Sequence, residues 1–461
     1  TSYLAWGATA IRLSMSPNAL IWREFVAVLQ RRARTLRRAI YRSNEEDRFK
    51  LIRFVVLRLP ISTEWKQRAI AWAWNRVARS QSFSPSTLVS AQRALLEKGR
   101  ARLHELLSGS DRLLVSKSAI PRVSYILVLL NKAELSVLAI DSVAHFGGKD
   151  YELILIDNAS TDATAALLER VQGATVLRNP TNTGFGPACM QAARMARGQF
   201  LCFLNNDAVL TEGAMDAALC NFQKATVGAV GGKVLLADGR LQEAGSIVWS
   251  DGTTLGYGRG EDPTLPQYNY RRPVDYCSAV FLVTRKDLFD RLGGFSAEFA
   301  PAYFEDTDYC MKLWRRGFSV VYEPKSIIIH YESATSGGIE SASVLMLAQK
   351  AKFQHRWKSE LRWHYSNESR NAIPARTAVN APGLRIIYID DRLPQRHLGA
   401  GFPRSNDILR ELAGAGHKVV CATFTFPLIE DQRGDIPLEV EQFDGCRFRE
   451  KLIRDYFPWA D

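Results

Sequence analysis

Four apolar runs, each carrying asparagine or aspartate toward its carboxyl end, constrain the fold of this chain more than any other feature. The runs are VSYILVLLN (123–131), YELILIDNAS (151–160), GATVLRNPTNTG (173–184) and QFLCFLNND (199–207). Segments with helical periodicity separate them, at residues 133–144, 161–171 and 186–196. Buried strands that alternate with helices predict an α/β domain with a mainly parallel sheet covered on both faces.

A row of polar side chains is expected along one edge of that sheet. The carboxyl ends of parallel strands meet at one edge, and ligands of such sheets bind just outside it. Aspartate and asparagine do not contribute to a hydrophobic core, so the pattern predicts a binding site. The side chains concerned are Asn131, Asp157, Asn158, Asn179, Asn182, Asn205, Asn206 and Asp207.

Three later segments complete the predicted domain. Residues 274–295 (VDYCSAVFLVTRKDLFDRLGGF) indicate a strand followed by a helix, and residues 304–317 (FEDTDYCMKLWRRG) indicate a helix with an acidic start. Residues 319–333 (SVVYEPKSIIIHYES) indicate two closing strands. The domain is therefore expected to span residues 118–365, followed by a linker at 366–383.

The N-terminal region, residues 1–117, is predicted to be helical and basic. Residues 1–120 hold 22 Lys and Arg against 8 Asp and Glu, whereas the rest of the chain has a net charge of −2. The arginine-rich face of residues 23–42 is either a solvated helix face or a contact with an anionic membrane. Nucleic acid is not expected as a partner, because aromatic residues do not alternate with the basic ones. Any membrane contact would be peripheral, through residues 1–60.

A second α/β pattern begins at residue 384 and reaches the end of the chain. It offers a strand, a glycine-containing loop, a helix and another strand, which is too little to complete a domain. The chain also starts at Thr1 rather than at a methionine. We therefore expect both ends to be cuts from a longer protein.

The cysteines and the apolar runs indicate a cytoplasmic protein. The seven cysteines form no Cys-x-x-Cys pair and lie mostly in apolar runs, which favours reduced, buried thiols over a disulfide framework. No signal peptide is evident, and no apolar run approaches the ~20 residues that span a bilayer.

Several residues of the predicted site have both a chemical and a purely structural interpretation. Asp157 either accepts hydrogen bonds from a base or ribose or caps a turn. Asp207 follows two amides and suits a hard divalent cation that bridges to phosphates, or it ends a strand. A nicotinamide dehydrogenase is disfavoured, because Gly184 and Gly186 lack the third glycine of the dinucleotide fingerprint.

The acidic cluster at residues 305–308 and His330, which ends a strand, also have both a chemical and a structural interpretation. Glu305, Asp306 and Asp308 lie at a helix start, where the helix dipole favours acidic residues, yet a loop next to an open site also suits a catalytic base. His330 closes an apolar strand and is either a metal ligand or part of the structure.

Taken in order, these motifs resemble the family 2 glycosyltransferases, which have a GT-A fold, over roughly residues 121–336. The nearest branch is the rhamnosyltransferase-like one that builds bacterial surface polysaccharides such as O-antigen. The motifs are ILVLLN, ELILIDNASTD, NPTNTGFGPACMQA, CFLNNDAVL, GKVLLADGRLQEAG, FLVTRKDLFDRLGGFSAEF, FEDTDYCMKLWRRGF and IIIHYESATSG.

The resemblance implies a role for each matching position. Asp157 and Asn158, with Asn131, would hold the nucleoside, and Asn182 and Gly184 would close a loop over the nucleotide. Asn206 and Asp207 belong to the Asp-x-Asp element, with Asp207 as a ligand of Mg²⁺ or Mn²⁺ and His330 as a second ligand. Asp306 would be the general base, with Glu305 beside it. Two positions depart from the family pattern: Asn205 replaces the leading aspartate, and Leu130 replaces an aromatic residue.

The resemblance also implies the reaction and its partners. The chain would move a sugar from a nucleotide-sugar donor to a hydroxyl of a glycan or lipid-linked glycan, with inversion and with a divalent metal. The branch favours dTDP-rhamnose as donor and leaves UDP- and GDP-sugars open. The alternative is an inactive nucleotide-sugar-binding module of a multidomain transferase. Residues 384–461 resemble the opening, incomplete Rossmann-like β-α-β of a GT-B glycosyltransferase of the family 4 kind.

Overall fold

The computed structural model describes residues 85–332, 339–399, 401–424, 435–444 and 449–461. Most of the predicted basic helical region therefore lies outside the described residues, including the segment proposed to contact a membrane. The described part of that region contains the helix α4 (Pro85–Ser108), which agrees with the predicted helical character. Among the described residues, no helix has both the length and the apolar character that a membrane crossing requires.

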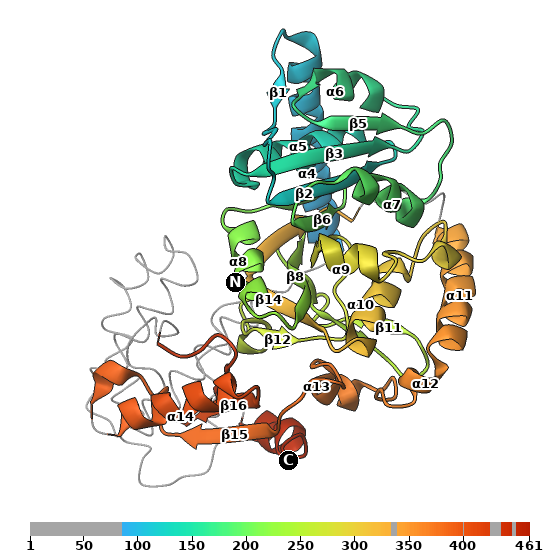
Figure 1. Cartoon of the computed structure of the whole chain (residues 1–461). Helices are drawn as coiled ribbons and strands as arrows, with labels where there is room; N and C mark the ends of the chain where they lie inside the picture. The colour runs from blue at the N-terminus through green and yellow to red at the C-terminus, as the bar shows by residue number, and fades with distance from the viewer. Residues whose placement is uncertain (1–84, 333–338, 400, 425–434, 445–448) are drawn as a thin grey trace, which may run out of the picture. The chain divides into compact units, whose positions relative to one another are not determined.

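The predicted α/β domain is built on a ten-stranded mixed sheet (Figure 1). Its principal strands lie in the order β12-β14-β8-β13-β6-β2-β3-β5. The four strands β6, β2, β3 and β5 are mutually parallel, as the sequence predicts. Antiparallel β13 joins them to the parallel pair β8 and β14. The strands are β2 (Val123–Leu129), β3 (Tyr151–Asp157), β5 (Thr175–Arg178), β6 (Phe200–Leu204), β7 (Ala208–Leu210), β8 (Val227–Leu236), β9 (Leu241–Ala244), β12 (Arg272–Pro273), β13 (Phe281–Arg285) and β14 (Ser319–His330).

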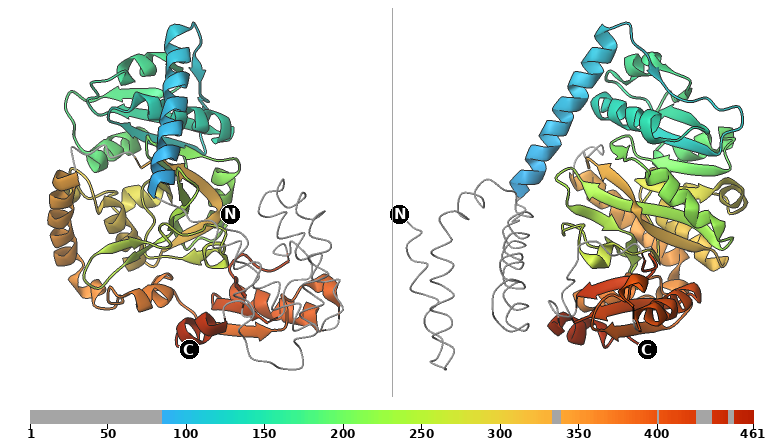
Figure 2. Two further views of the ribbon diagram at one scale, coloured as in Figure 1. Left: turned by 180° about the vertical axis from the view of Figure 1, so that it is seen from behind. Right: turned by 90° about the vertical axis from the view of Figure 1, so that its left-hand side faces the viewer.

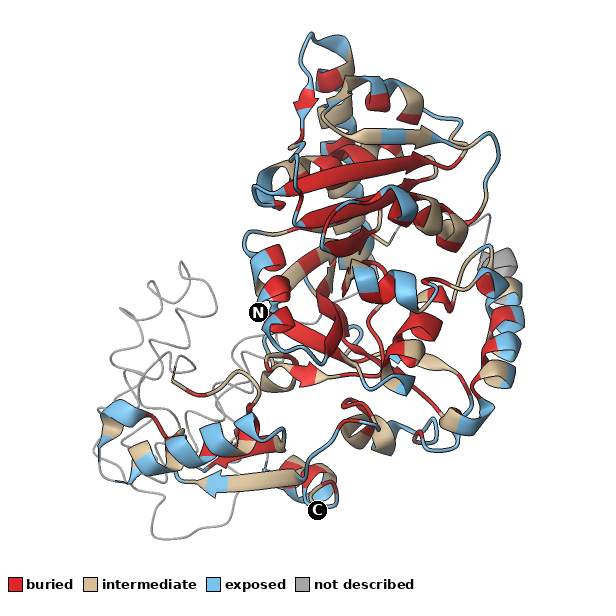
Figure 3. Ribbon diagram, viewed as in Figure 1, coloured by how far each residue is buried: buried red, intermediate tan, exposed pale blue. Residues whose placement is uncertain are grey.

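Both faces of the sheet are covered, with α4 in front of the strands in the left view of Figure 2, and the central strands are buried throughout (Figure 3). Side chains alternate along β2, so that Tyr125 and Leu127 enter one apolar cluster and Ile126 and Val128 enter the other. Helices α4, α5, α6 and α8 pack into the first cluster, whereas α7, α9, α10 and α11 pack into the second. The helices are α5 (Ala133–Phe146), α6 (Thr164–Arg170), α7 (Phe185–Met195), α8 (Ala214–Cys220), α9 (Lys286–Arg291), α10 (Glu305–Arg315), α11 (Ile339–Arg356), α12 (Lys358–Leu361) and α13 (Ala372–Ala375).

The prediction of two closing strands at residues 319–333 is wrong. The segment forms one twelve-residue strand, β14, whose pairing with β8 shifts register between Glu323 and Ile327. Pro324 lies inside that irregularity and cannot donate a hydrogen bond to a neighbouring strand. The change of register accommodates the proline, so the segment continues as one strand.

The second α/β pattern also folds as predicted at the level of its elements. Strands β15 (Arg385–Asp390) and β16 (Lys418–Thr423) are parallel, α14 (Phe402–Gly414) connects them, and β17 (Glu441–Asp444) adds a third parallel strand. The segment predicted as a linker, 366–383, contains α13 and ends in a turn before β15.

A buried ion pair fastens the C-terminal strands to the residues that precede them. Arg376 and Glu441 have side chains that are each 1% exposed, and Arg376 Nη1 lies 3.2 Å from Glu441 Oε1. The Tyr456 hydroxyl donates to the same carboxylate at 2.7 Å. Burial of two charges is tolerated only when each neutralises the other, so this contact ties the two segments together.

We expect Glu441→Gln to lower the free energy of unfolding by about 3–5 kcal/mol, because Arg376 would be left as a buried, unpaired charge. Urea unfolding of the full chain measures the change. The matched control is Asp287→Asn, which breaks an ion pair with Arg291 whose side chains are 72% and 65% exposed, and which should change stability by less than about 1 kcal/mol. Equal losses in the two variants would contradict the assignment.

Candidate active site

The carboxyl ends of β2, β3 and β6 converge, as the sequence predicts, and hydrogen bonds join them. The Asn131 N–H donates to Ser160 Oγ at 2.8 Å, and the Ser160 N–H donates to Asp157 Oδ1 at 2.9 Å. The Asn131 side-chain oxygen accepts from the Thr161 N–H at 2.8 Å. Asn206 Nδ2 donates to the Asn131 carbonyl at 3.3 Å. Predicted site residues that lie 75 positions apart are therefore neighbours.

Asp157 and Asn131 each keep one polar group available. Asp157 uses Oδ1 in the turn, and among the described residues Oδ2 has no hydrogen-bond partner. Asn131 uses its side-chain oxygen and keeps the Nδ2 amide, which is a donor. A ligand at this edge would meet one acceptor and one donor side by side, a combination that suits the edge of a heterocyclic base.

Asn158 instead organises the loop at residues 179–184. Its amide donates to Asn182 Oδ1 at 2.8 Å and to the Gly184 carbonyl at 3.3 Å. Its side-chain oxygen accepts from Asn179 Nδ2 at 3.0 Å and from the Thr183 N–H at 3.1 Å. The residue is 2% exposed and its hydrogen-bonding capacity is taken up within the loop, so it shapes the site rather than facing it.

Gly184 is a position where only glycine fits. Its φ is +88°, and a Cβ there would lie 2.4 Å from the Pro301 carbonyl oxygen. The neighbouring Phe185 N–H donates to that same carbonyl at 2.8 Å. The loop after β5 is thereby held against the segment that leads into α10 and the acidic cluster.

Asp207 and His330 come into direct contact. Asp207 Oδ1 lies 3.0 Å from His330 Nε2, and both side chains are less than 10% exposed. His330 Nδ1 lies 2.7 Å from Gln242 Oε1, and Nε2 faces the carboxylate. Strand pairing sets the contact, because β14 places His330 opposite Ala208.

The chemistry of this pair fits a divalent cation. A carboxylate oxygen is a typical donor to Mg²⁺ or Mn²⁺, and an imidazole nitrogen suits Mn²⁺ better than the harder Mg²⁺; phosphate oxygens and water would complete the shell. Gln242 supports the imidazole from its far side, as outer-sphere partners of metal-bound histidines do. Within the described ranges, no group of three or more His, Cys, Asp or Glu side chains is placed to hold a metal ion.

Asp306 and Glu305 begin helix α10 and differ in their surroundings. Asp306 is half-buried and accepts from the Ala279 N–H at 2.9 Å and from the Thr307 N–H at 2.6 Å. Burial raises the pKa of Asp306, and these hydrogen bonds oppose the rise. Glu305 is 6% exposed, and its Oε2 has no partner. Burial, with Asp306 adjacent, raises the pKa of Glu305 well above its usual range.

Asp308, the third acid of the cluster, belongs to the scaffold. It is 0% exposed and lies 2.9 Å from Arg356 Nε and 3.2 Å from Lys312 Nζ. It also accepts hydrogen bonds from Ser296 Oγ at 2.7 Å and from Trp357 Nε1 at 2.9 Å. These contacts anchor the end of α11 to α10, and they leave Asp308 no part in proton transfer.

Backbone strain marks the same region independently. Among the described residues, every non-glycine residue with positive φ lies within two positions of a predicted site residue. Strained conformations of this kind persist only where the surrounding structure enforces them, and they concentrate at functional sites. The residues are Asn131, Lys132, Ala159, Tyr303, Phe304 and Glu332, with φ from 50° to 76°.

Two neighbours of the site were missed by the sequence analysis: Gln242, which contacts His330, and Glu243. Glu243 is 5% exposed and accepts from Ser278 Oγ at 2.6 Å and from Ser246 Oγ at 2.7 Å. The available signal was a Gln-Glu pair inside an otherwise apolar strand, Leu241–Ala244.

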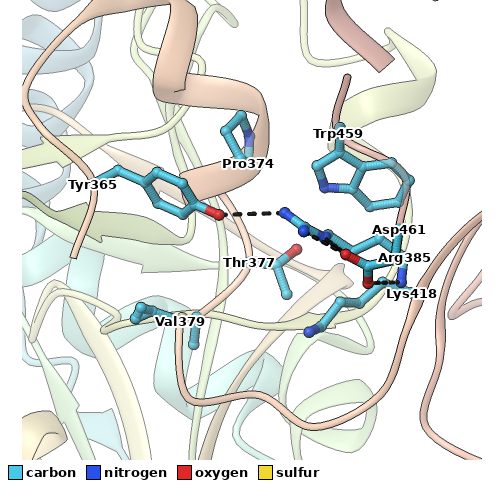
Figure 4. A pocket seen from close by; sticks show the side chains of 9 residues that line it. Tyr365, Pro374, Thr377, Val379, Arg385, Lys418, Trp459 and Asp461 are labelled. Atoms are coloured by element: carbon cyan, nitrogen blue, oxygen red, sulfur yellow. Dashed lines mark hydrogen bonds and ion pairs between the residues drawn. The ribbon is translucent and has the colours of Figure 1, made fainter. Parts of the chain in front are cut away.

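A cavity of about 240 Å³ lies elsewhere, next to the C-terminal strands (Figure 4). None of the predicted site residues lines it. Its two cations are already engaged, because Arg385 pairs with Asp461 and Lys418 donates to the Ala381 carbonyl at 2.7 Å. The cavity is therefore not the candidate site.

Comparisons with known proteins match the part of the chain that holds Asn131, Asp157 and Asp207. Residues 124–293 match the model "Glycosyl transferase family 2". Protein y4gI of Sinorhizobium fredii is 28% identical over 199 residues, 41% of this chain and 22% of that protein. O-antigen biosynthesis protein RfbC of Myxococcus xanthus is 30% identical over 229 residues, 47% of this chain and 18% of that protein.

The chain thus spans about a fifth of the length of these two relatives. Among solved structures, that of GalNAc-T7 with UDP, GalNAc and Mn²⁺ is similar over 53% of this chain and 50% of its own, with 16% identity and a TM-score of 0.44.

We expect Gly184→Ala to destabilise the protein more than Gly213→Ala. Gly213 is left-handed helical, which costs another residue about 1–2 kcal/mol, whereas Gly184, with φ +88° and ψ 165°, lies in a region that is essentially restricted to glycine. Only the Cβ at position 184 would collide with backbone, because nothing lies within 4 Å of one at position 213. Urea denaturation midpoints measure the difference. Equal midpoints would show that the loop yields to Pro301 without cost.

Proposed function

We propose that this chain, whose residues 124–293 match the family 2 glycosyltransferase model, transfers a sugar with inversion from a nucleoside-diphosphate donor to a hydroxyl of a glycan or lipid-linked glycan. The observation that carries the proposal is the contact of Asp207 with His330, at the edge where Asp157 and Asn131 also lie. Diphosphate recognition, nucleoside recognition and a candidate base then share one site.

The nucleoside would be held by Asp157 and Asn131. The free oxygen of Asp157 suits an N–H of a base, and the free amide of Asn131 suits a carbonyl. Asn182 and Gly184 close the neighbouring loop, which Asn158 keeps in shape. Asn206, whose amide donates to Ser136 Oγ at 3.0 Å, would fix the approach of β6 to α5 rather than bind the donor.

Asp207 and His330 would hold Mg²⁺ or Mn²⁺. When bound, such an ion neutralises the diphosphate and makes it a better leaving group. Asn205 stands where the family pattern has an aspartate, so the carboxylate of Asp207 is the one negative charge of the Asn205–Asp207 element. The metal should then bind together with the donor rather than ahead of it.

Asp306 would act as the general base. The acceptor oxygen attacks the anomeric carbon as its proton passes to the Asp306 carboxylate, and the bond from that carbon to the diphosphate oxygen breaks. One displacement inverts the configuration, so no covalent nucleophile is needed. Glu305, buried beside Asp306 with an unpartnered oxygen, would line the acceptor side of the site.

The rhamnosyltransferase-like motifs favour dTDP-rhamnose as donor, with UDP- and GDP-sugars as alternatives. The similarity to an O-antigen biosynthesis protein supports a role in surface polysaccharide synthesis. We place that role at the cytoplasmic face of the membrane. Residues 384–461 would begin a GT-B module, for which the parallel β15-α14-β16 unit offers support. A second module would make the parent protein a multidomain transferase.

Ligand binding tests the donor class. A thermal-shift screen of the chain with dTDP, UDP, GDP and NAD, each with and without Mn²⁺, should show a metal-dependent shift with one nucleoside diphosphate. A ligand at 100 times its dissociation constant adds ~2.7 kcal/mol of stability. Asp207→Ala should abolish the metal-dependent part of the shift. Stabilisation by NAD alone would overturn the proposal.

Turnover tests the base. Asp306→Asn should keep nucleotide binding and lower transfer by at least about a hundredfold, because the amide cannot take the acceptor proton. Release of nucleoside diphosphate from UDP-GlcNAc, GDP-mannose or dTDP-rhamnose measures the rate. Near-normal turnover in this variant would place the base elsewhere. Normal binding without turnover in the unmodified chain, on every donor and acceptor tried, would favour an inactive binding module.

A further inference from the structure

Glu243 is a buried carboxylate for which the proposed reaction has no role. It lies on β9 and receives three hydrogen bonds, all from serines. Ser246 Oγ donates to Oε2 at 2.7 Å, whereas Ser278 donates to Oε1 twice, from Oγ at 2.6 Å and from its N–H at 3.4 Å. Short contacts of hydroxyls with a carboxylate are among the stronger hydrogen bonds in proteins.

The segment that Glu243 holds is also the segment that holds Asp306. The N–H of Ala279, next to Ser278, donates to Asp306 Oδ2 at 2.9 Å. Adjacent peptide groups therefore point at two different carboxylates. The next carbonyl, that of Val280, accepts from the Asn205 N–H at 3.1 Å, which ties the same segment to the end of β6.

Position along the chain makes this link specific. Ser246 and Ser278 contact opposite oxygens of one carboxylate. Ser278 belongs to the segment that touches Asp306, whereas Ser246 meets that segment only through backbone hydrogen bonds with Tyr276, which a change of its side chain leaves in place. The distance from Ala279 to Asp306 thus depends on where Glu243 places Ser278. A displacement of about 1 Å is enough to reduce a catalytic rate strongly.

We propose that Glu243 is a positioning residue for the transfer reaction, which acts through Ser278 and Ala279 to set the orientation of Asp306. The inference rests on the proposed function of Asp306 as the base. It assigns Glu243 no contact with donor, acceptor or metal. Burial and the nearby Asp306 carboxylate raise the pKa of Glu243, which agrees with two carboxylates held close together.

The two serines supply a matched pair for the test. Ser278→Ala removes the hydroxyl on the Asp306 side, and Ser246→Ala removes an equivalent hydroxyl on the other side. With Mn²⁺ and the sugar nucleotide that supports turnover, Ser278→Ala should lower kcat about tenfold and leave KM for the donor within twofold. Ser246→Ala should stay within twofold in both constants, and Ser278→Thr, which keeps the hydroxyl, should recover most of the rate.

A second readout does not depend on activity. Hydrogen–deuterium exchange of a peptide that covers residues 277–281 should be faster in Ser278→Ala and in Glu243→Ala than in Ser246→Ala, because the segment that holds the Ala279 N–H against Asp306 is no longer fixed by Glu243. Equal exchange in the three variants, or equal effects of the two serine changes on kcat, would overturn the inference. A failure of the proposed function would give a different result: Asp306→Asn would then keep its turnover, whatever the exchange rates of the serine and Glu243 variants.

Discussion

The register of strand β14 is the constraint on which the candidate site depends. β14 pairs with β8 over most of its length, and its last three residues also pair with β7. That double pairing places His330 opposite Ala208, so that its imidazole contacts Asp207, which lies 123 positions earlier in the sequence. The Tyr331 N–H also donates to the Asp207 carbonyl, at 2.9 Å. A slip of one residue would turn the imidazole to the other face of the sheet. The irregularity around Pro324 is therefore tolerated, but the pairing at the end of the strand is not free to vary.

Many of the polar side chains around the candidate site stabilise the structure of the site rather than face a ligand. Asn158 and Asp308 are both nearly or fully buried, and each satisfies several partners from separate segments. Buried polar groups stabilise a structure only when they are satisfied, and networks of this kind enforce one arrangement. The positive φ values at Asn131 and Phe304 show that this arrangement is held against backbone preference. Asn158 adjoins Asp157 and Asp308 lies on the same helix as Asp306, so these contacts support those two carboxylates.

The sequence was sufficient to predict the parallel strands β2, β3, β5 and β6, the helices between them and the edge at which polar residues gather, because those depend on periodicity and on where strands end. It could not separate residues that face a ligand from residues that fold the loop. Asn131 and Asn158 are alike in sequence, because each follows a buried strand. Asn131 nevertheless keeps a free side-chain amide, whereas both polar groups of the Asn158 side chain form hydrogen bonds with neighbouring residues. Asp306 and Asp308 also look alike in sequence, although the contacts of Asp308 tie it to the fold. Its partner Arg356 lies nearly 50 residues further along the chain, so a local sequence pattern cannot reveal the contact.

Strand β9 shows why such distant contacts matter to the chemistry. Gln242 contacts His330 on the diphosphate side of the proposed reaction, and Glu243, the next residue, reaches Asp306 through Ser278 on the acceptor side. Successive residues of a strand point in opposite directions, so one dipeptide can support two groups that must act on either side of an anomeric carbon. In the proposed reaction, β9 and the segment of Ser278 and Ala279 would together set the spacing between leaving-group stabilisation and proton removal. A single displacement requires that spacing to be held, because both events belong to one transition state.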